Sequence, residues 1–199
     1  MVYIFFCVSG VLGLIEHHPS LTTREGEPKA SRPLEADTSL IAGVLDAYPG
    51  GVVVIANDWP FYYDLASLRE AGGEFERRIV NVVRTLSGSK EEAILDFMAG
   101  RAEPFVVIAS PDFEFTEQTA SVRIDIDHKS GFHDAARASL LLRLHALGDH
   151  ASNPLSEDDL LRATVSSRDL RRAQKLFSPL RAGSDAAFQH KLRLLIARR

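Results

Sequence analysis

The chain has 199 residues, of which 45% are hydrophobic and 25% charged, the ordinary composition of a globular domain. This length allows one domain with an appendage, and the formal net charge of −4 excludes a global electrostatic attraction to nucleic acid or acidic membranes. The single cysteine, Cys7, excludes an intramolecular disulfide and favours a reducing, cytoplasmic location.

The run from Met1 to Ile15 is almost entirely apolar, which is also a property of signal peptides and membrane anchors. A secretory signal needs a basic start and a small-residue cleavage site, but no Lys or Arg precedes Arg24. The run is too short to span a bilayer. We therefore expect a buried strand over Val2–Val8 and no membrane association.

Further along the chain, short runs of β-branched and aromatic residues alternate with helical stretches. The stretch from Ser9 to Pro33 is rich in Gly, Pro, Ser, Thr and charge, which indicates a long loop. Ser89 is the expected N-cap of a helix. Strands are predicted at Val52–Ile55, Arg78–Val83, Pro104–Ala109 and Val122–Ile126, and helices at Leu34–Tyr48, Tyr62–Ala71, Lys90–Met98 and Ala135–Leu147.

Such alternation is typical of βαβ units, in which helices cover both faces of a parallel sheet. We predict a three-layer α/β fold with a parallel sheet of about five strands. Ligands bind such sheets at the carboxyl ends of the strands. The corresponding residues here are Cys7 to Gly10, Ala56 to Trp59, Ala109 to Asp112 and Asp125 to Lys129.

Beyond Asp149 the chain becomes basic, with Lys or Arg at ten positions up to Arg199. Interspersed leucines predict two or three short amphipathic helices. We therefore predict an α/β domain over residues 1–148 and a basic helical C-terminal extension over residues 149–199. The basic face of this extension is either an ordinary solvated surface or a binding surface for an acidic protein or nucleic acid.

The stretch Phe5-Phe6-Cys7-Val8-Ser9-Gly10-Val11-Leu12 resembles the first motif of the haloacid-dehalogenase (HAD) superfamily. In that motif a hydrophobic strand ends in Asp-x-Asp-Gly, often followed by Val-Leu. The Gly and the Val-Leu match, but the two acidic positions fall on Cys7 and Ser9. The resemblance implies a Rossmann-like fold of the HAD type for roughly residues 1 to 147.

Three later stretches resemble other motifs of a capless HAD-like group. At the end of the second strand, Ala56-Asn57-Asp58 occupies three polar positions of the second motif, and Pro60 the position of an Arg. Lys90 resembles the basic third motif, and Asp127 to Gly131 a turn before the last helix. The fourth strand should end in two acids but ends in Ala109-Ser110-Pro111, which leaves Asp112 as the only, weak, metal candidate.

The chemistry that the resemblance implies needs a carboxylate nucleophile, a second Asp as general acid and base, and Mg²⁺. Cys7 is a poor Mg²⁺ ligand, and Ser9 cannot act as an acid near neutral pH. We therefore expect a HAD-like pseudoenzyme with a binding or regulatory role. We expect a phosphate-containing ligand to bind at Gly10, Asn57, Asp58 and Lys90. We expect no cofactor; Mg²⁺ would be needed only if phosphatase activity is retained.

Two alternatives concern Cys7 and the histidines. The Cys7 thiol in the nucleophile position favours an active hydrolase with atypical chemistry, whereas a cysteine at a strand end is more often a small buried apolar residue. The acidic residues Asp125 and Asp127, with His17, His18, His128 and His133, suggest a metal site. Their spacing matches no standard zinc pattern, so scattered surface histidines are the favoured interpretation.

Overall fold

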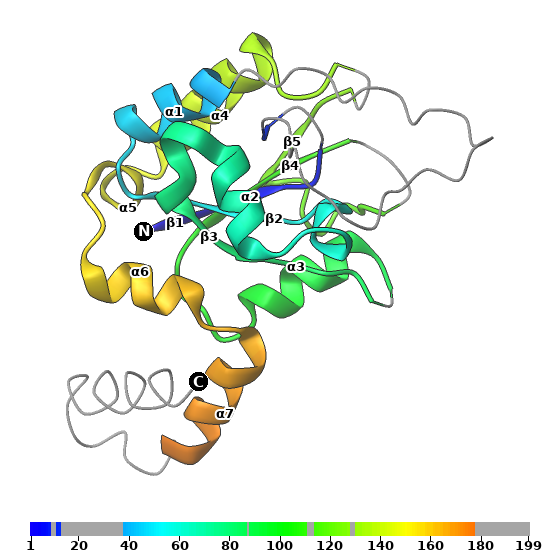
Figure 1. Cartoon of the computed structure of the whole chain (residues 1–199), viewed down its shortest axis with the longest axis vertical. Helices are drawn as coiled ribbons and strands as arrows, with labels where there is room; N and C mark the ends of the chain where they lie inside the picture. The colour runs from blue at the N-terminus through cyan, green and yellow to red at the C-terminus, as the bar shows by residue number, and fades with distance from the viewer. Residues whose placement is uncertain (9–10, 13–37, 87, 111–113, 128–129, 178–199) are drawn as a thin grey trace.

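The protein is described here by a computed structural model that covers residues 1–8, 11–12, 38–86, 88–110, 114–127 and 130–177. Five parallel strands form one sheet in the order β3-β2-β1-β4-β5 (Figure 1). The strand β1 lies at the centre and pairs with both β2 and β4. The strands are β1 (Val2–Phe6), β2 (Gly51–Ile55), β3 (Ile79–Val82), β4 (Phe105–Ala109) and β5 (Arg123–Asp125).

Helices cover both faces of this sheet, which confirms the predicted three-layer α/β fold. After β3 the chain reverses its direction across the sheet, so right-handed connections place the next helix on the opposite face. One face carries α1 (Thr38–Ala47), α2 (Leu65–Gly72) and α4 (Asp134–Ala146); the other carries α3 (Lys90–Met98) and α6 (Glu157–Thr164).

The central strand β1 is buried along its whole length. Successive side chains of a strand point to opposite faces of the sheet. Accordingly, Ile4 and Phe6 pack in the core beneath α1, α2 and α4, whereas Tyr3 and Phe5 pack in the core beneath α3. A continuous apolar run is the pattern expected of a strand that is covered on both sides.

Capping residues fix where the helices begin. Ser89 caps α3 as predicted: its hydroxyl accepts from the Glu92 N–H at 3.1 Å, and the Glu92 carboxylate accepts from the Ser89 N–H at 3.0 Å. The next helix upstream, predicted from Tyr62, begins only at Leu65. There the Asp64 carboxylate accepts from the Ser67 N–H at 2.8 Å, and the short 3₁₀ helix η1 (Trp59–Phe61) precedes it.

The chain after α4 packs against the sheet well beyond the predicted boundary at residue 148. It forms α5 (Asp149–Ser152), α6 and α7 (Ser167–Phe177). Ala151 lies in one core, and Ala163 lies in the other. The side-chain amide of Asn81 in β3 lies 3.2 Å from the carbonyl oxygens of Ala163 and Thr164. The packed unit therefore extends at least to the end of α6.

The two outer strands of the sheet have different surroundings. In β3, the Ile79 carbonyl accepts from Arg69 Nε at 2.8 Å, and the Val82 N–H donates to the Asn81 side chain at 2.9 Å. On the other side, β5 has only three residues, and Arg123 forms an ion pair of 2.5 Å with Asp125. Within the described ranges no helix is long and apolar enough to cross a membrane.

Candidate functional site

Four chemically active side chains come together at the carboxyl edge of the sheet, and they are hereafter the Lys90 cluster. Cys7 directly follows β1, Asp58 lies just after β2, Lys90 opens α3, and Glu114 lies in the chain after β4. The Lys90 ammonium lies 2.7 Å from Glu114 Oε2 and 3.7 Å from Asp58 Oδ1. The strand order reverses between β1 and β4, and ligands of open α/β sheets bind at such a reversal.

The electrostatics of the cluster keep Lys90 charged. Its partial burial lowers its pKa, because desolvation disfavours the ammonium. The hydrogen bond to Glu114 and the charges of Asp58, Glu114 and Cys7 outweigh this effect, so the pKa of Lys90 lies above its ordinary value. The Cys7 side chain is half-buried against the core beneath α3.

The two carboxylates of the cluster differ in exposure. The Lys90 and Glu114 side chains are only 17% and 21% exposed, whereas that of Asp58 is 72% exposed. Solvent weakens an ion pair at the surface, so the contact with Glu114 is the stronger one. Glu114 is thus the more buried partner of the Lys90 ammonium, and Asp58 is the solvent-exposed one.

The position of Glu114 depends on the buried carboxylate of Glu91, which is 3% exposed. It accepts hydrogen bonds from the N–H and the hydroxyl of Thr116 at 3.0 and 2.7 Å, and from those of Thr119 at 3.2 and 2.6 Å. Burial raises the pKa of Glu91, but these four bonds outweigh it and leave the pKa below its ordinary value. Glu91 therefore anchors the connection between β4 and β5, which carries Glu114.

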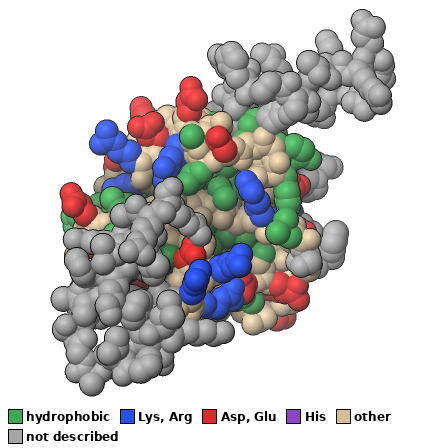
Figure 2. Space-filling view, turned by 60° about the horizontal axis from the view of Figure 1, so that its bottom comes forward, with side chains coloured by type: hydrophobic (Ala, Val, Ile, Leu, Met, Phe, Trp, Pro, Cys, Tyr) green, Lys and Arg blue, Asp and Glu red, His purple; other side chains and the backbone are tan. Residues whose placement is uncertain are grey.

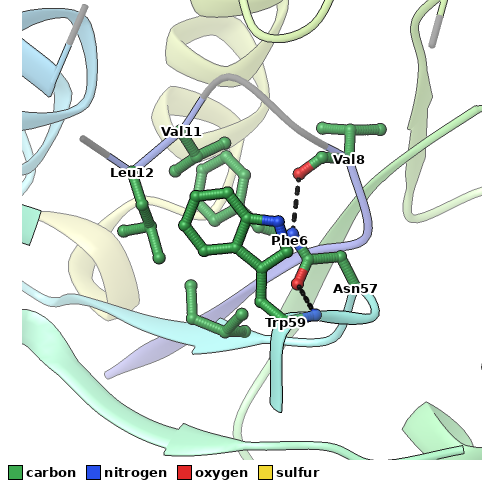
Figure 3. A pocket seen from close by; sticks show the side chains of 7 residues that line it. Phe6, Val8, Val11, Leu12, Asn57 and Trp59 are labelled. Atoms are coloured by element: carbon green, nitrogen blue, oxygen red, sulfur yellow. Dashed lines mark hydrogen bonds between the residues drawn. The ribbon is translucent and has the colours of Figure 1, made fainter. Parts of the chain in front are cut away.

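At the end of β1, the indole of Trp59 is part of the lining of an apolar pocket (Figure 3). Asn57 bridges its rim: its amide donates to the Val8 carbonyl at 3.2 Å, and its side-chain oxygen accepts from the Trp59 N–H at 3.1 Å. These bonds fasten the residues after β1 to those after β2. The pocket is lined by Phe6, Val8, Val11, Leu12, Ile55, Asn57 and Trp59.

The other predicted site residues do not join the Lys90 cluster in the described part of the chain. Asp125 pairs with Arg123, and His133 caps α4, where its Nδ1 accepts from the Ala136 N–H at 3.4 Å. Across the described ranges, no three His, Cys, Asp or Glu side chains are grouped so that they could hold a metal ion. Ser9, Gly10, His17, His18, Asp112 and His128 lie outside the described residues.

The sequence did not predict Glu114. It lies five residues beyond the end of β4, past Asp112, the acid that the motif pattern favoured. The signal that was present is an acid between two aromatic residues, Phe113 and Phe115. Phe115 packs against the core beneath α3. Its packing keeps the neighbouring Glu114 near the body of the domain.

Basic residues of the predicted extension pair with acidic residues of the core. Arg171 of α7 forms an ion pair with Asp96 of α3, with one N–O distance of 3.1 Å, and Arg162 lies 3.5 Å from Glu103. Figure 2 shows the face at this end of the molecule, where Lys and Arg side chains lie among acidic and hydrophobic ones. Binding of nucleic acid or an acidic protein there remains a prediction.

Comparison with protein-family models, with curated proteins and with solved structures finds no match to this chain. The case for a function therefore depends on the side chains at the carboxyl edge of the sheet.

Proposed function

We propose that this chain is a HAD-like pseudoenzyme that binds a phosphate-containing ligand at the Lys90 cluster. The observation that carries the proposal is the position of Lys90, a half-buried cation at the carboxyl edge of the sheet, beside the reversal between β1 and β4. Lysine binds phosphate as a point charge with three N–H donors. The neighbouring Cys7 and Asp58 lie where the resemblance expects residues of the first and second motifs.

Binding of phosphate involves an exchange of partners at Lys90. The ammonium already contacts Glu114 and Asp58, so a phosphate dianion competes with both carboxylates. The inner partner, Glu114, is the stronger competitor because it is shielded from solvent. Phosphate affinity is then set by how readily Glu114 gives up its contact with Lys90.

Hydrolysis of that ligand through the family's aspartyl intermediate is excluded by the residue types present. Cys7 offers a thiol in place of the carboxylate nucleophile, and Ser9 offers a hydroxyl that cannot protonate a leaving group near neutral pH. In this proposal the Lys90 cluster binds and orients a phosphate, and Ser9 does not replace the family's general acid.

Calorimetric titration with inorganic phosphate at pH 7 and low salt tests the binding proposal. Replacing Lys90 with glutamine is expected to weaken phosphate binding about tenfold, which corresponds to the loss of one cationic contact. Replacing Glu114 with glutamine is expected to tighten it several-fold, because the competing carboxylate is removed. Unchanged affinity in Lys90→Gln, or no heat of binding with the unmodified protein, would overturn the proposal.

A matched control for Lys90→Gln is Arg77→Gln. Arg77 lies in the 3₁₀ helix η2 (Gly73–Arg78), which precedes β3 and so lies at the amino edge of the sheet. Its side chain is exposed, and its ion-pair contact with Glu76 is long, at 4.0 Å. Arg77→Gln changes the net charge by the same amount as Lys90→Gln, so it is expected to leave phosphate affinity unaltered.

A second candidate function is a hydrolase with Cys7 as its nucleophile. It is favoured by the position of Cys7 directly after β1, where its charge is among those that raise the pKa of Lys90, since a nearby cation stabilises a thiolate. Incubation of the protein with p-nitrophenyl phosphate and Mg²⁺ separates the two candidates. Under the binding proposal, release of nitrophenolate stays at the level of Cys7→Ala; turnover that disappears in Cys7→Ala favours the hydrolase.

A further inference from the structure

The connection between β4 and β5 contacts α3 at two successive residues of the helix. Its part over residues 114–120 is hereafter the strap. At one contact, the Glu114 carboxylate lies 2.7 Å from the Lys90 ammonium. At the other, two threonines of the strap donate four hydrogen bonds to the carboxylate of Glu91, the next residue of α3. The segment that carries Glu114 is therefore fastened beside Lys90 by a second, separate set of bonds.

The fastening at Glu91 is shielded from solvent and braced from β5. Glu91 is 3% exposed and Thr119 is fully buried, and hydrogen bonds are stronger in such surroundings than in water. The guanidinium of Arg123 donates to the Thr116 carbonyl at 2.8 Å and to the Thr119 hydroxyl at 3.3 Å. These contacts fix the middle of the strap relative to the first turn of α3.

The short distance along the chain couples the two contacts of the strap. Glu114 comes two residues before Thr116, and two residues of extended chain span at most about 7 Å. Phe115, between them, packs against the core beneath α3. While Thr116 stays on Glu91, the Glu114 carboxylate therefore remains close to Lys90 at a high effective concentration.

We infer that the strap is an autoinhibitory device, in which Glu114 occupies Lys90 in place of phosphate and the two threonines on Glu91 set how firmly it does so. This inference depends on the proposed function and adds the regulation of the same site. Thr116 and Thr119 act through Glu114, so they are positioning residues. The coupling is reciprocal: a phosphate on Lys90 removes one attachment of the strap, and the strap then opens more often.

Calorimetric titration of Thr119 variants with inorganic phosphate tests this inference. Thr119→Val has a similar shape but lacks the hydroxyl, and it is expected to bind phosphate about threefold more tightly, the effect of losing roughly one hydrogen bond of the fastening. Thr119→Ser keeps a hydroxyl and is expected to retain the original affinity. In the Glu114→Gln background, Thr119→Val is expected to leave phosphate affinity unaltered, because the carboxylate that it positions is absent.

Hydrogen exchange gives a second measurement on the unmodified protein. The Thr116 and Thr119 N–H groups both donate to Glu91, so their exchange reports the opening of the strap. Saturating phosphate is expected to speed their exchange several-fold, although ligand binding ordinarily slows exchange near a site. In Glu114→Gln, phosphate is expected to leave these two rates unchanged.

The outcomes separate the inference from the proposed function. Phosphate affinity that is unaltered in Thr119→Val, or that rises equally with and without Glu114, overturns the coupling but leaves phosphate binding intact. Unchanged or slower exchange of the two threonine amides with phosphate also overturns the coupling. No heat of binding with the unmodified protein overturns the proposed function itself.

Discussion

Replacing Glu91 with alanine is expected to lower the free energy of unfolding by roughly 3 kcal/mol, since a buried charged acceptor is removed while its donors remain. The carboxylate accepts four hydrogen bonds from Thr116 and Thr119. Thr119 is fully buried, so its donors find no water in the variant. Urea denaturation at pH 7, followed by circular dichroism, measures the loss.

The matched control is the next residue, Glu92, whose exposed carboxylate belongs to the capping box of α3. Glu92→Ala is expected to cost no more than about 1 kcal/mol, the usual contribution of a cap. If both variants lose the same free energy, the four bonds of Glu91 do not anchor the connection between β4 and β5.

The same residue predicts how stability changes with pH. The pKa of Glu91 is lower in the folded protein than its ordinary value, and an unfolded glutamate titrates at about pH 4.3. Its contribution is therefore complete above that pH and is lost as the pH falls through the folded pKa. The unfolding free energy of the unmodified protein should fall more steeply in acid than that of Glu91→Gln.

Replacing Gly50 with alanine is expected to cost about 2–3 kcal/mol, the effect of forcing an atom into a packed site. A Cβ at this position lies 2.8 Å from the carbonyl oxygens of Ala151 and Asn153, and closer still to that of His150. These are backbone atoms, which cannot move aside independently. The Gly50 N–H also donates to the Ala151 carbonyl at 2.7 Å, so relief of the clash requires α5 to leave the sheet.

A second glycine gives the opposite expectation and serves as the control. Gly43 lies inside α1, and a Cβ there meets Arg137 Nη2 at an ordinary 3.8 Å. Gly43→Ala is therefore expected to stabilise the protein by about 0.5–1 kcal/mol, the gain from removing a flexible residue from a helix. Thermal unfolding of both variants tests the pair: a Gly50→Ala protein as stable as the unmodified one contradicts the close contact with α5.

Local patterns were sufficient to predict the elements of the fold. The apolar run after Met1 predicted β1, and Ser89 predicted the start of α3, because a cap is a contact between residues close together in the sequence. The order of the strands could not be predicted in this way. The pairing of β1 with both β2 and β4 depends on how the crossovers pack, which no short stretch of sequence specifies.

The candidate site was predicted only where a residue follows a strand or opens a helix. Cys7, Asp58 and Lys90 meet these conditions, and the parallel sheet brings them to one edge. Glu114 was missed because its position depends on the anchor at Glu91, a contact between residues far apart along the chain. The packing of Ala163 was missed for a similar reason, since an amphipathic pattern predicts a buried face but not its partner.

The polar contacts around β3 have a consequence for how this protein behaves among copies of itself. An outer strand with open N–H and C=O groups is a template onto which another chain can add, and such addition leads to aggregates and fibrils. Here the Arg69 and Asn81 side chains already occupy backbone groups of β3, and α6 packs beside it. At the opposite end β5 is short and charged. Both outer strands of the sheet are thus protected against the addition of another chain, and α6 contributes to this protection at β3.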